Sequence, residues 1–246
     1  MKTQHFLLPF ALLSMPTTAI PATPCWGYSG ESAPESWGKL DPAFAACEKG
    51  FYQSPIDIQS AIKGKLPPLS LSFTAKQGTL VHNGHTIQID VTDGDKLRLD
   101  NQDFIFQQFH FHTPSENLID GKSYPLEAHF VHRSSQGELA VVGVMFIEGR
   151  VNPAIAQILQ SLPSQKNVNA PLTAPLALTD LLPQNKSYYR FSGSLTTPPC
   201  TEGVRWLLLR EPVELSAAQI TAFSAALGMK NNRPVHPLNG RMIVTE

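Results

Sequence analysis

The chain has 246 residues, of which 42% are apolar and 16% are charged, and its formal net charge is −1. This length suits one large domain or two small ones, and either arrangement can bury a sizeable core. The charge excludes a strongly basic nucleic-acid-binding protein, and the composition excludes an acidic disordered chain.

The N-terminus has the pattern of a secretory signal peptide. A basic start is followed by a short apolar run over 6–13 and then by small residues. The run is too short to span a bilayer as a helix, and no later stretch is long enough to do so. We expect cleavage after Ala19 or Ala22, so that 1–22 is the signal peptide and 23–246 the mature domain outside the cytoplasm. The alternative is a disordered tail that is retained.

Three cysteines leave one unpaired if an oxidising compartment forms one disulfide. The sequence does not choose among the three possible pairs. Cys25 lies close to the expected cleavage point and lacks the flanking residues of a lipidated cysteine. We take it as the unpaired thiol, which could join two chains.

Apolar patterns along the chain predict many strands and few helices. The segment 87–91 alternates apolar and polar residues, and Asn83-Gly84 separates it from the run 79–81, which predicts a hairpin. Further strands are expected over 97–99, 104–112, 126–132, 139–147 and 204–209. The run 139–147 is apolar on both faces, so this strand should be central in its sheet.

Two short helices have clear start signals. Asn152-Pro153 combines a cap residue with a proline at the first helical position, and this helix should end before Pro163. A capping box over 216–219 starts the second helix, and Gly228 is placed to end it. The stretches 29–36 and 163–175 are interpreted as loops, and neither marks a domain boundary.

A histidine pair in the aromatic strand predicts a metal site. Because side chains alternate faces along a strand, His110 and His112 share one face with Gln108 and can reach one ion. Either His129 or His132 could be a third ligand; they lie on opposite faces, so only one can join, and parity does not say which.

Three histidines with an open fourth position are typical of catalytic zinc, and no cysteine lies nearby to close a structural site. The alternatives are a pair of solvent-facing histidines without a metal and a cupin-like metal site.

Several short motifs follow one another along the chain. They are Trp26-Gly27-Tyr28, Gln53-Ser54-Pro55-Ile56-Asp57-Ile58, Asn83-Gly84-His85, Gln108-Phe109-His110-Phe111-His112, Ser115-Glu116, Glu127-Ala128-His129-Phe130-Val131-His132, Ser194-Leu195-Thr196-Thr197-Pro198-Pro199-Cys200 and Asn232-Arg233-Pro234. In this order and spacing they resemble the alpha-class carbonic anhydrases of the secreted bacterial type. The resemblance implies a mainly β (α+β) single domain, with a large twisted, mostly antiparallel sheet of about ten strands and short peripheral helices.

The same resemblance implies zinc-dependent, reversible hydration of CO2 to bicarbonate and a proton, by attack of a zinc hydroxide, with ester hydrolysis as a side activity. It assigns the zinc to three ligands: His110, His112 and His129. His132 is then a packed histidine on the opposite face. Gln108 and Glu127 would orient His110 and His129 respectively.

Further roles follow from the resemblance. Thr196 would be the gatekeeper that donates a hydrogen bond to Glu116, since a carboxylate can only accept. His85 would shuttle the proton, because histidine titrates near neutral pH. The relay waters would be ordered or bordered by three residues: Tyr28, Asn83 and Gln88. The substrate pocket would be lined by six: Val131, Val141, Leu195, Thr197, Val204 and Trp206.

The resemblance also pairs Cys47 with Cys200 and implies cis bonds before Pro55 and Pro199. It implies sulfonamide and anion inhibitors, no nucleic-acid partner, no membrane span, a periplasmic or secreted location, and a homodimer, which such proteins often form.

Two other functions remain as alternatives. A non-catalytic carbonic-anhydrase-like binding module would usually lack a zinc histidine, and all three are present. A different metal-dependent hydrolase would need an acid to protonate its leaving group, and Glu116 is already engaged.

Overall fold

The computed structural model describes residues 25–71, 73–91, 94–163 and 165–246. The expected signal peptide and both of its cleavage sites lie outside these residues. Within the described ranges, no helix is long and apolar enough to cross a membrane.

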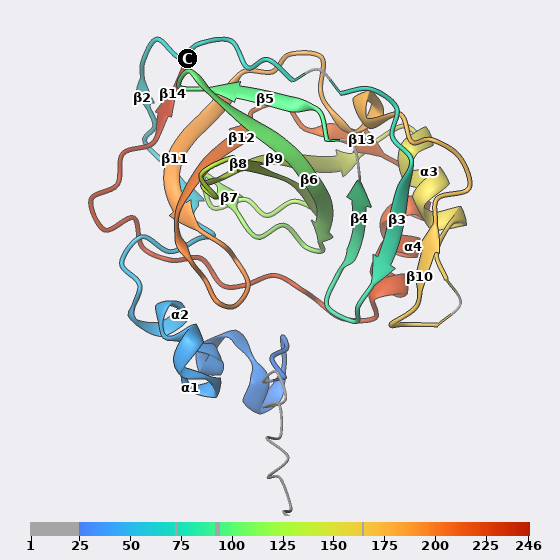
Figure 1. Ribbon diagram of the computed structural model, residues 1–246, viewed down its shortest axis with the longest axis horizontal. Helices are drawn as coiled ribbons and strands as arrows, with labels where there is room; N and C mark the ends of the chain where they lie inside the picture. The colour runs from blue at the N-terminus through green and yellow to red at the C-terminus, as the bar shows by residue number, and fades with distance from the viewer. Residues whose placement is uncertain (1–24, 72, 92–93, 164) are drawn as a thin grey trace, which may run out of the picture.

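A large, strongly curved sheet of twelve strands dominates the molecule (Figure 1). Its strands follow the order β10-β3-β4-β6-β8-β9-β12-β11-β14-β2, while β5 pairs with β6 and β13 pairs with β9. The four longest strands are β6 (Gln102–His112), β8 (Leu126–Ser134), β9 (Leu139–Glu148) and β12 (Glu202–Leu209). The others are β2 (Ile62–Lys63), β3 (Gly78–His82), β4 (Ile87–Val91), β5 (Lys96–Leu99), β10 (Asn169–Pro171), β11 (Tyr188–Ser194), β13 (Val213–Leu215) and β14 (Val244–Thr245).

Most neighbouring strands are antiparallel, and β9 has parallel neighbours in β12 and β13. The apolar character of β9 on both faces follows from this central place, as the sequence predicted. A separate parallel pair is formed by β1 (Asp57–Ile58) and β7 (Leu118–Ile119). The expectation of a large, mostly antiparallel sheet is confirmed.

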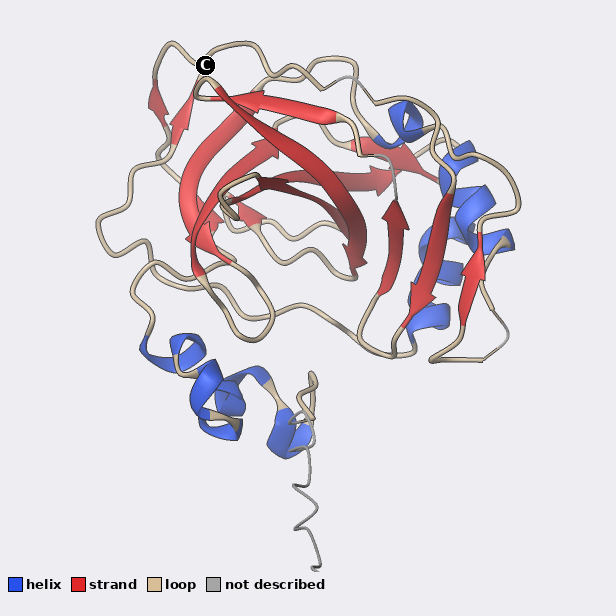
Figure 2. Ribbon diagram, viewed as in Figure 1, coloured by secondary structure: helices blue, strands red, loops and turns tan. Residues whose placement is uncertain are grey.

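The helices are short and lie at the periphery (Figure 2). They are α1 (Trp37–Leu40), α2 (Ala46–Lys49), α3 (Pro153–Gln160) and α4 (Ala217–Leu227). Asn152 caps α3 by accepting a hydrogen bond from the N–H of Ile155, and α4 has the predicted capping box and ends at Gly228, whose φ is +71°. Both helices predicted from the sequence are therefore confirmed.

The two stretches interpreted as loops contain short elements, so that interpretation was incomplete. The stretch 29–36 contains two 3-10 turns, Gly30–Ser32 and Pro34–Ser36. Two further 3-10 turns lie outside both stretches, at Pro42–Phe44 and Leu178–Leu181. In 163–175, β10 pairs with β3, a long-range contact that local composition does not reveal.

The two faces of the sheet are buried differently. One face of β6 and β8 packs an aromatic core against α4, where Phe111 and Phe223 lie 4.8 Å apart between ring centroids. The other face carries the histidines. A bulge between Phe106 and Gln108 resets the alternation of β6, so that Phe104 and Phe109 both reach the aromatic core.

Candidate metal centre

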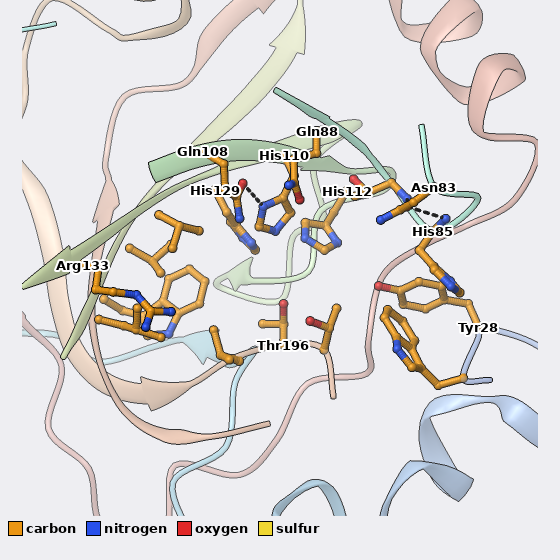
Figure 3. A pocket seen from close by; sticks show the side chains of 18 residues that line it. Tyr28, Asn83, His85, Gln88, Gln108, His110, His112, His129, Arg133 and Thr196 are labelled. Carbon is orange, nitrogen blue, oxygen red and sulfur yellow. Dashed lines mark hydrogen bonds between the residues drawn. The ribbon is translucent and has the colours of Figure 1, made fainter. Parts of the chain in front are cut away.

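Three histidines from two adjacent strands meet on one face of the sheet (Figure 3). His110 on β6 lies directly opposite His129 on β8, and His112 follows two residues further along β6. The ring nitrogens that they offer all lie within 4.8 Å of one another. His132 lies on the opposite face, where its ring stacks on that of Phe73. The register therefore brings His129, and not His132, to the pair on β6.

Each ring has one nitrogen engaged by an oxygen atom of the protein. The distances are 2.9 Å from His110 Nδ1 to Gln108 Oε1, 2.7 Å from His112 Nδ1 to the Asn231 carbonyl, and 2.9 Å from His129 Nε2 to Glu127 Oε1. An oxygen acceptor fixes the N–H on the nitrogen that it contacts, which leaves a lone pair on the other nitrogen. Three lone pairs are thus presented to one point.

The residues present fit a zinc ion. Nε2 of His112 is buried and has no hydrogen-bond partner within the described structure. An unpaired buried polar atom is costly, and a bound cation would remove that cost. Burial lowers the pKa of each of the three histidines, which favours the neutral form that binds metal. A set of three imidazoles without thiolate is typical of a zinc site with an open position.

The carboxyl group of Glu127, which orients His129, is itself positioned by other residues. Its carboxyl group accepts hydrogen bonds from the backbone N–H of Glu116 at 2.8 Å and from both the backbone and the side chain of Asn117, at 2.9 and 2.7 Å. Burial raises the pKa of Glu127, and the hydrogen bonds from Asn117 lower it. These donors keep the carboxyl group as an acceptor for the His129 N–H.

Glu116 is fully buried beside the same histidines. Oε1 accepts the backbone N–H of Arg233 at 2.9 Å, while Oε2 lies 3.4 Å from Nε2 of His112 and 3.9 Å from Nδ1 of His129. Burial raises the pKa of this carboxyl group, and the Thr196 hydroxyl lowers it. Oε2 has no partner with regular hydrogen-bond geometry among the described residues. A cation at the centre would favour the ionised carboxylate.

Thr196 lies in the loop that follows β11. Two backbone hydrogen bonds close this loop, from Leu195 to Thr201 and from Cys200 to Thr197, each 2.9 Å long. The predicted Cys47–Cys200 disulfide is present and ties the loop to α2, and Cys25 is the free, exposed cysteine. The cis bonds expected before Pro55 and Pro199 are confirmed, and a third precedes Pro114.

A cavity of about 280 Å³ leads to the three histidines. Its apolar side is formed by Val131, Leu139, Val141, Leu195 and Trp206, and its more polar side by Tyr28, Asn83, His85 and Gln88. Thr196 lies between the two sides (Figure 3), and Thr197 also lines the cavity.

The comparisons with known proteins agree with this geometry. A model of the eukaryotic-type carbonic anhydrase family matches residues 32–246. The chain belongs to this family. The carbonic anhydrase of Pectobacterium atrosepticum is 50% identical over 219 residues, which cover 89% of this chain and 90% of that relative.

Two solved carbonic anhydrases have the same fold. The Photobacterium profundum alpha-carbonic anhydrase is 49% identical with a TM-score of 0.84, covering 89% of this chain and 99% of that one. The Thermovibrio ammonificans enzyme in complex with the inhibitor sulfanilamide is 45% identical with a TM-score of 0.88, covering 91% and 100%. The resemblance drawn from the motifs is thereby confirmed for family and fold.

Most of the residues that the carbonic anhydrase resemblance singled out lie on or directly below this cavity. Gln108 lines the cavity, and Glu116 and Glu127 lie beneath it. Val204 does not line it: the residue is 1% exposed and packs in the cluster that contains Val141 and Trp206.

The rim of the cavity around His85 is built from the N-terminal segment and the β3–β4 turn. The His85 ring stacks on Trp26, with centroids 4.2 Å apart, and its Nδ1 is buried without a hydrogen-bond partner in the described structure. Asn83 Oδ1 accepts the backbone N–H of His85 at 3.0 Å. Burial lowers the pKa of His85 and raises that of Tyr28.

Several residues of the site were not predicted. Asn117 holds Glu127, the Asn231 carbonyl holds His112, and four further residues line the cavity: Trp26, Thr86, Arg133 and Leu139. Trp26 and Asn231 lie in or beside motifs that carried the resemblance, but no local pattern assigns them a contact. Leu139 could have been predicted only from its pairing with Arg133 on β8, and that pairing requires the register of two strands.

Proposed function

We propose that this chain catalyses the reversible hydration of CO2 to bicarbonate and a proton, with zinc held by His110, His112 and His129. The three oriented imidazoles at the base of the cavity carry the proposal, because their free lone pairs face one point. When bound, zinc would supply a Lewis acid that makes water nucleophilic near neutral pH.

Thr196 and Glu116 would direct the attacking water. An ionised Glu116 can only accept a hydrogen bond, so the Thr196 hydroxyl must point its proton at the carboxylate. The oxygen of Thr196 is then left to accept a hydrogen bond from the water, which turns a lone pair of the water toward the substrate. Thr196 and Glu116 are both buried, and Oε2 of Glu116 has no other donor within the described structure, which supports this pairing.

The apolar side of the cavity would receive CO2. The substrate is small and has no net dipole, so it gains most from a surface that water leaves readily. Val141 and Trp206 are 2% and 1% exposed, and Val131 and Leu195 complete the surface next to His129. Thr197 would contact the substrate from the loop, and Val204 would support Val141 and Trp206 from behind.

His85 would carry the product proton to the solvent. It lies at the rim, on the side of the cavity away from the apolar surface (Figure 3). Because burial lowers its pKa, the ring is neutral at pH 7 and can accept a proton. Tyr28, Asn83 and Gln88 surround the intervening space and would order its water.

We also infer that the protein works outside the cytoplasm, in the periplasm or as a secreted enzyme. The Cys47–Cys200 disulfide joins segments 153 residues apart, and such bonds persist in oxidising compartments. Residues 1–22 would be the signal peptide. The same centre would hydrolyse activated esters as a side activity, and anions would inhibit it by taking the open position. The homodimer stays a prediction.

The test is stopped-flow CO2 hydration by the mature, zinc-loaded protein, with and without an aromatic sulfonamide. We expect fast hydration that the sulfonamide abolishes. Folded, zinc-loaded protein without hydration would instead favour the non-catalytic binding module. Failure of the folded protein to take up zinc would overturn the metal centre itself.

A further inference from the structure

One arginine stands out among the side chains that line the cavity. Of the eighteen lining residues, Arg133 alone carries a permanent charge, and no carboxylate of the described chain is among them. The polar side, around Tyr28 and His85, consists of neutral groups at pH 7. The fixed charge of the cavity wall is therefore positive, and Arg133 supplies it.

Arg133 lies at the outer end of the apolar side. His129, Val131 and Arg133 alternate along β8, so all three side chains point to the same face. Four residues of strand separate Arg133 from His129, which is roughly 13 Å along the chain. Arg133 and His85 flank the three histidines from opposite sides (Figure 3).

The surface between the metal centre and Arg133 is continuous and apolar. Val131 and Arg133 face Val141 and Leu139 across the β8–β9 pair. Leu195 and Trp206 border the same side of the cavity. A molecule that lies along this surface with one end at the histidines therefore points its other end toward the guanidinium group.

The guanidinium group of Arg133 is exposed and has no hydrogen bond, ion pair or cation–π contact within the described structure. Other arginines of the same sheet are paired: Arg98 with Asp103 at 2.7 Å and Arg205 with Glu138 at 2.9 Å. The planar guanidinium group offers several N–H donors in a geometry that matches a carboxylate. Its donors are available to a ligand in the cavity.

We propose that Arg133 makes the apolar side of the cavity a binding site for small molecules with an apolar body and an anionic end. The anionic end pairs with Arg133 and the body covers Val131 and Leu139. The opposite end reaches the histidines, so this inference rests on the proposed metal centre as its anchor. Because the guanidinium group is solvent-exposed, the gain in affinity is modest and decreases with added salt.

Matched probes separate the charge from the shape. Benzenesulfonamide is the reference that carries only the zinc-binding group. In the first pair, 4-carboxybenzenesulfonamide is compared with its neutral carboxamide. In the second pair, one methylene is inserted between the ring and the carboxyl or carboxamide group. The dissociation constants are measured by calorimetry on the zinc-loaded protein at low and high salt. The readout is the ratio of carboxamide to carboxylate Kd, in which any general change of the cavity cancels.

We expect at least one carboxylate to bind about two- to fivefold more tightly than its carboxamide at low salt, as an exposed ion pair allows. Arg133→Gln should bring the ratio to about 1, and Arg133→Lys should retain part of it. Arg150→Gln removes the same charge from an exposed arginine paired with Glu214, away from the cavity, and should leave the ratio unchanged.

Two results would overturn the inference while leaving the metal centre intact. One is a ratio of 1 for both probe lengths in the unmodified protein, and the other is a preference that persists in Arg133→Gln. Failure of benzenesulfonamide itself to bind would overturn the metal centre and this inference together.

Discussion

Two histidines on β8, three residues apart, show how the two faces of one strand give the same side chain different chemistry. His129 faces the cavity, with Nε2 on a carboxylate and Nδ1 presented to two further imidazoles. His132 faces the aromatic core, stacked on Phe73, with Nδ1 on the Phe130 carbonyl and Nε2 without a partner. Both are fully buried.

The difference lies in what surrounds the second nitrogen. On the cavity face, the free nitrogen of His129 converges with those of His110 and His112, and an acceptor holds each ring from behind. On the core face, the free nitrogen of His132 has no second imidazole beside it within the described structure, and the ring packs against Phe73 and Phe106. Burial alone therefore does not mark a metal ligand; convergence and orientation do.

The largest effect should come from comparing His129→Ala with His132→Ala. We expect His129→Ala to remain folded but to lose zinc and to lose CO2 hydration by more than the ~100-fold that loss of an orienting partner can cost. His132→Ala should keep zinc and activity while its free energy of unfolding falls by about 2–4 kcal/mol, as for other cavities in cores. Metal analysis, stopped-flow hydration and denaturant unfolding measure the three quantities. A folded His132→Ala protein without zinc would contradict the assignment.

The next largest effect should come from the group behind His129. In the unmodified protein, both carboxyl oxygens of Glu127 accept hydrogen bonds, from Glu116, Asn117 and His129. In Glu127→Gln only one oxygen remains as an acceptor, and the amide nitrogen places N–H donors against a group that also donates. We expect zinc affinity to fall by ~10–100-fold. Competition with a chelator measures this, and Glu138→Gln, an exposed carboxylate that pairs with Arg205, is the matched control. Equal losses in both variants would contradict an orienting role.

Sequence patterns predicted the parts of this contrast that are local. Alternation within 108–112 placed His110 and His112 on one face, and the cap and stop residues of α3 and α4 predicted both helices. The choice of His129 over His132 needed the resemblance, because it depends on the register between β6 and β8. That register brings together residues 19 positions apart, which no local period encodes.

Other features depend on contacts that are long-range or made by the backbone. Asn231 holds His112 through a carbonyl oxygen that any residue carries, so its identity gives no signal. The bulge between Phe106 and Gln108 interrupts the alternation of β6. Short strands such as β10 and β14 exist because of their partners, and their two or three residues are too few for a periodic pattern.

A substitution of His85 at the rim of the cavity should have a smaller effect on catalysis than the loss of a zinc ligand. We expect His85→Ala to lower kcat by about tenfold or more while kcat/KM for CO2 changes little, because proton export follows conversion of CO2. The loss is below the ~10²–10⁴-fold typical of a positioned acid–base group, since solvent remains an alternative acceptor. Stopped-flow rates with and without added imidazole, which should restore kcat, provide the measurement.

The pH dependence of that step sharpens the test. Burial lowers the pKa of His85, so the His85-dependent part of kcat should reach half its maximum below pH 6.5, the ordinary value for histidine. Trp26→Ala uncovers the stacked ring and should move this midpoint up toward 6.5. A midpoint that does not respond to Trp26→Ala would show that the stacking does not set the pKa.

The smallest effect on catalysis, and a distinct effect on stability, is expected at His132. Burial lowers its pKa from 6.5 to about 4, so the unfolded chain binds a proton more readily than the folded protein between these values. Stability is therefore lost as pH falls through this window, by about 2 kcal/mol from pH 7 to pH 5 for this one group. In His132→Gln that part of the loss should disappear, whatever the substitution costs in packing at both pH values.

Denaturant unfolding at pH 7 and pH 5 isolates the titration from the packing. Phe106→Leu, a change at a neighbour of His132 in the same aromatic core, is the control, because it lowers stability without removing a titratable group. Its pH dependence should match that of the unmodified protein. If His132→Gln retained the full pH dependence, the acid sensitivity would have to come from other histidines, such as those of the cavity face or His236, whose pKa burial lowers to about 4. The contrast between the two faces of β8 would then lie in metal binding alone.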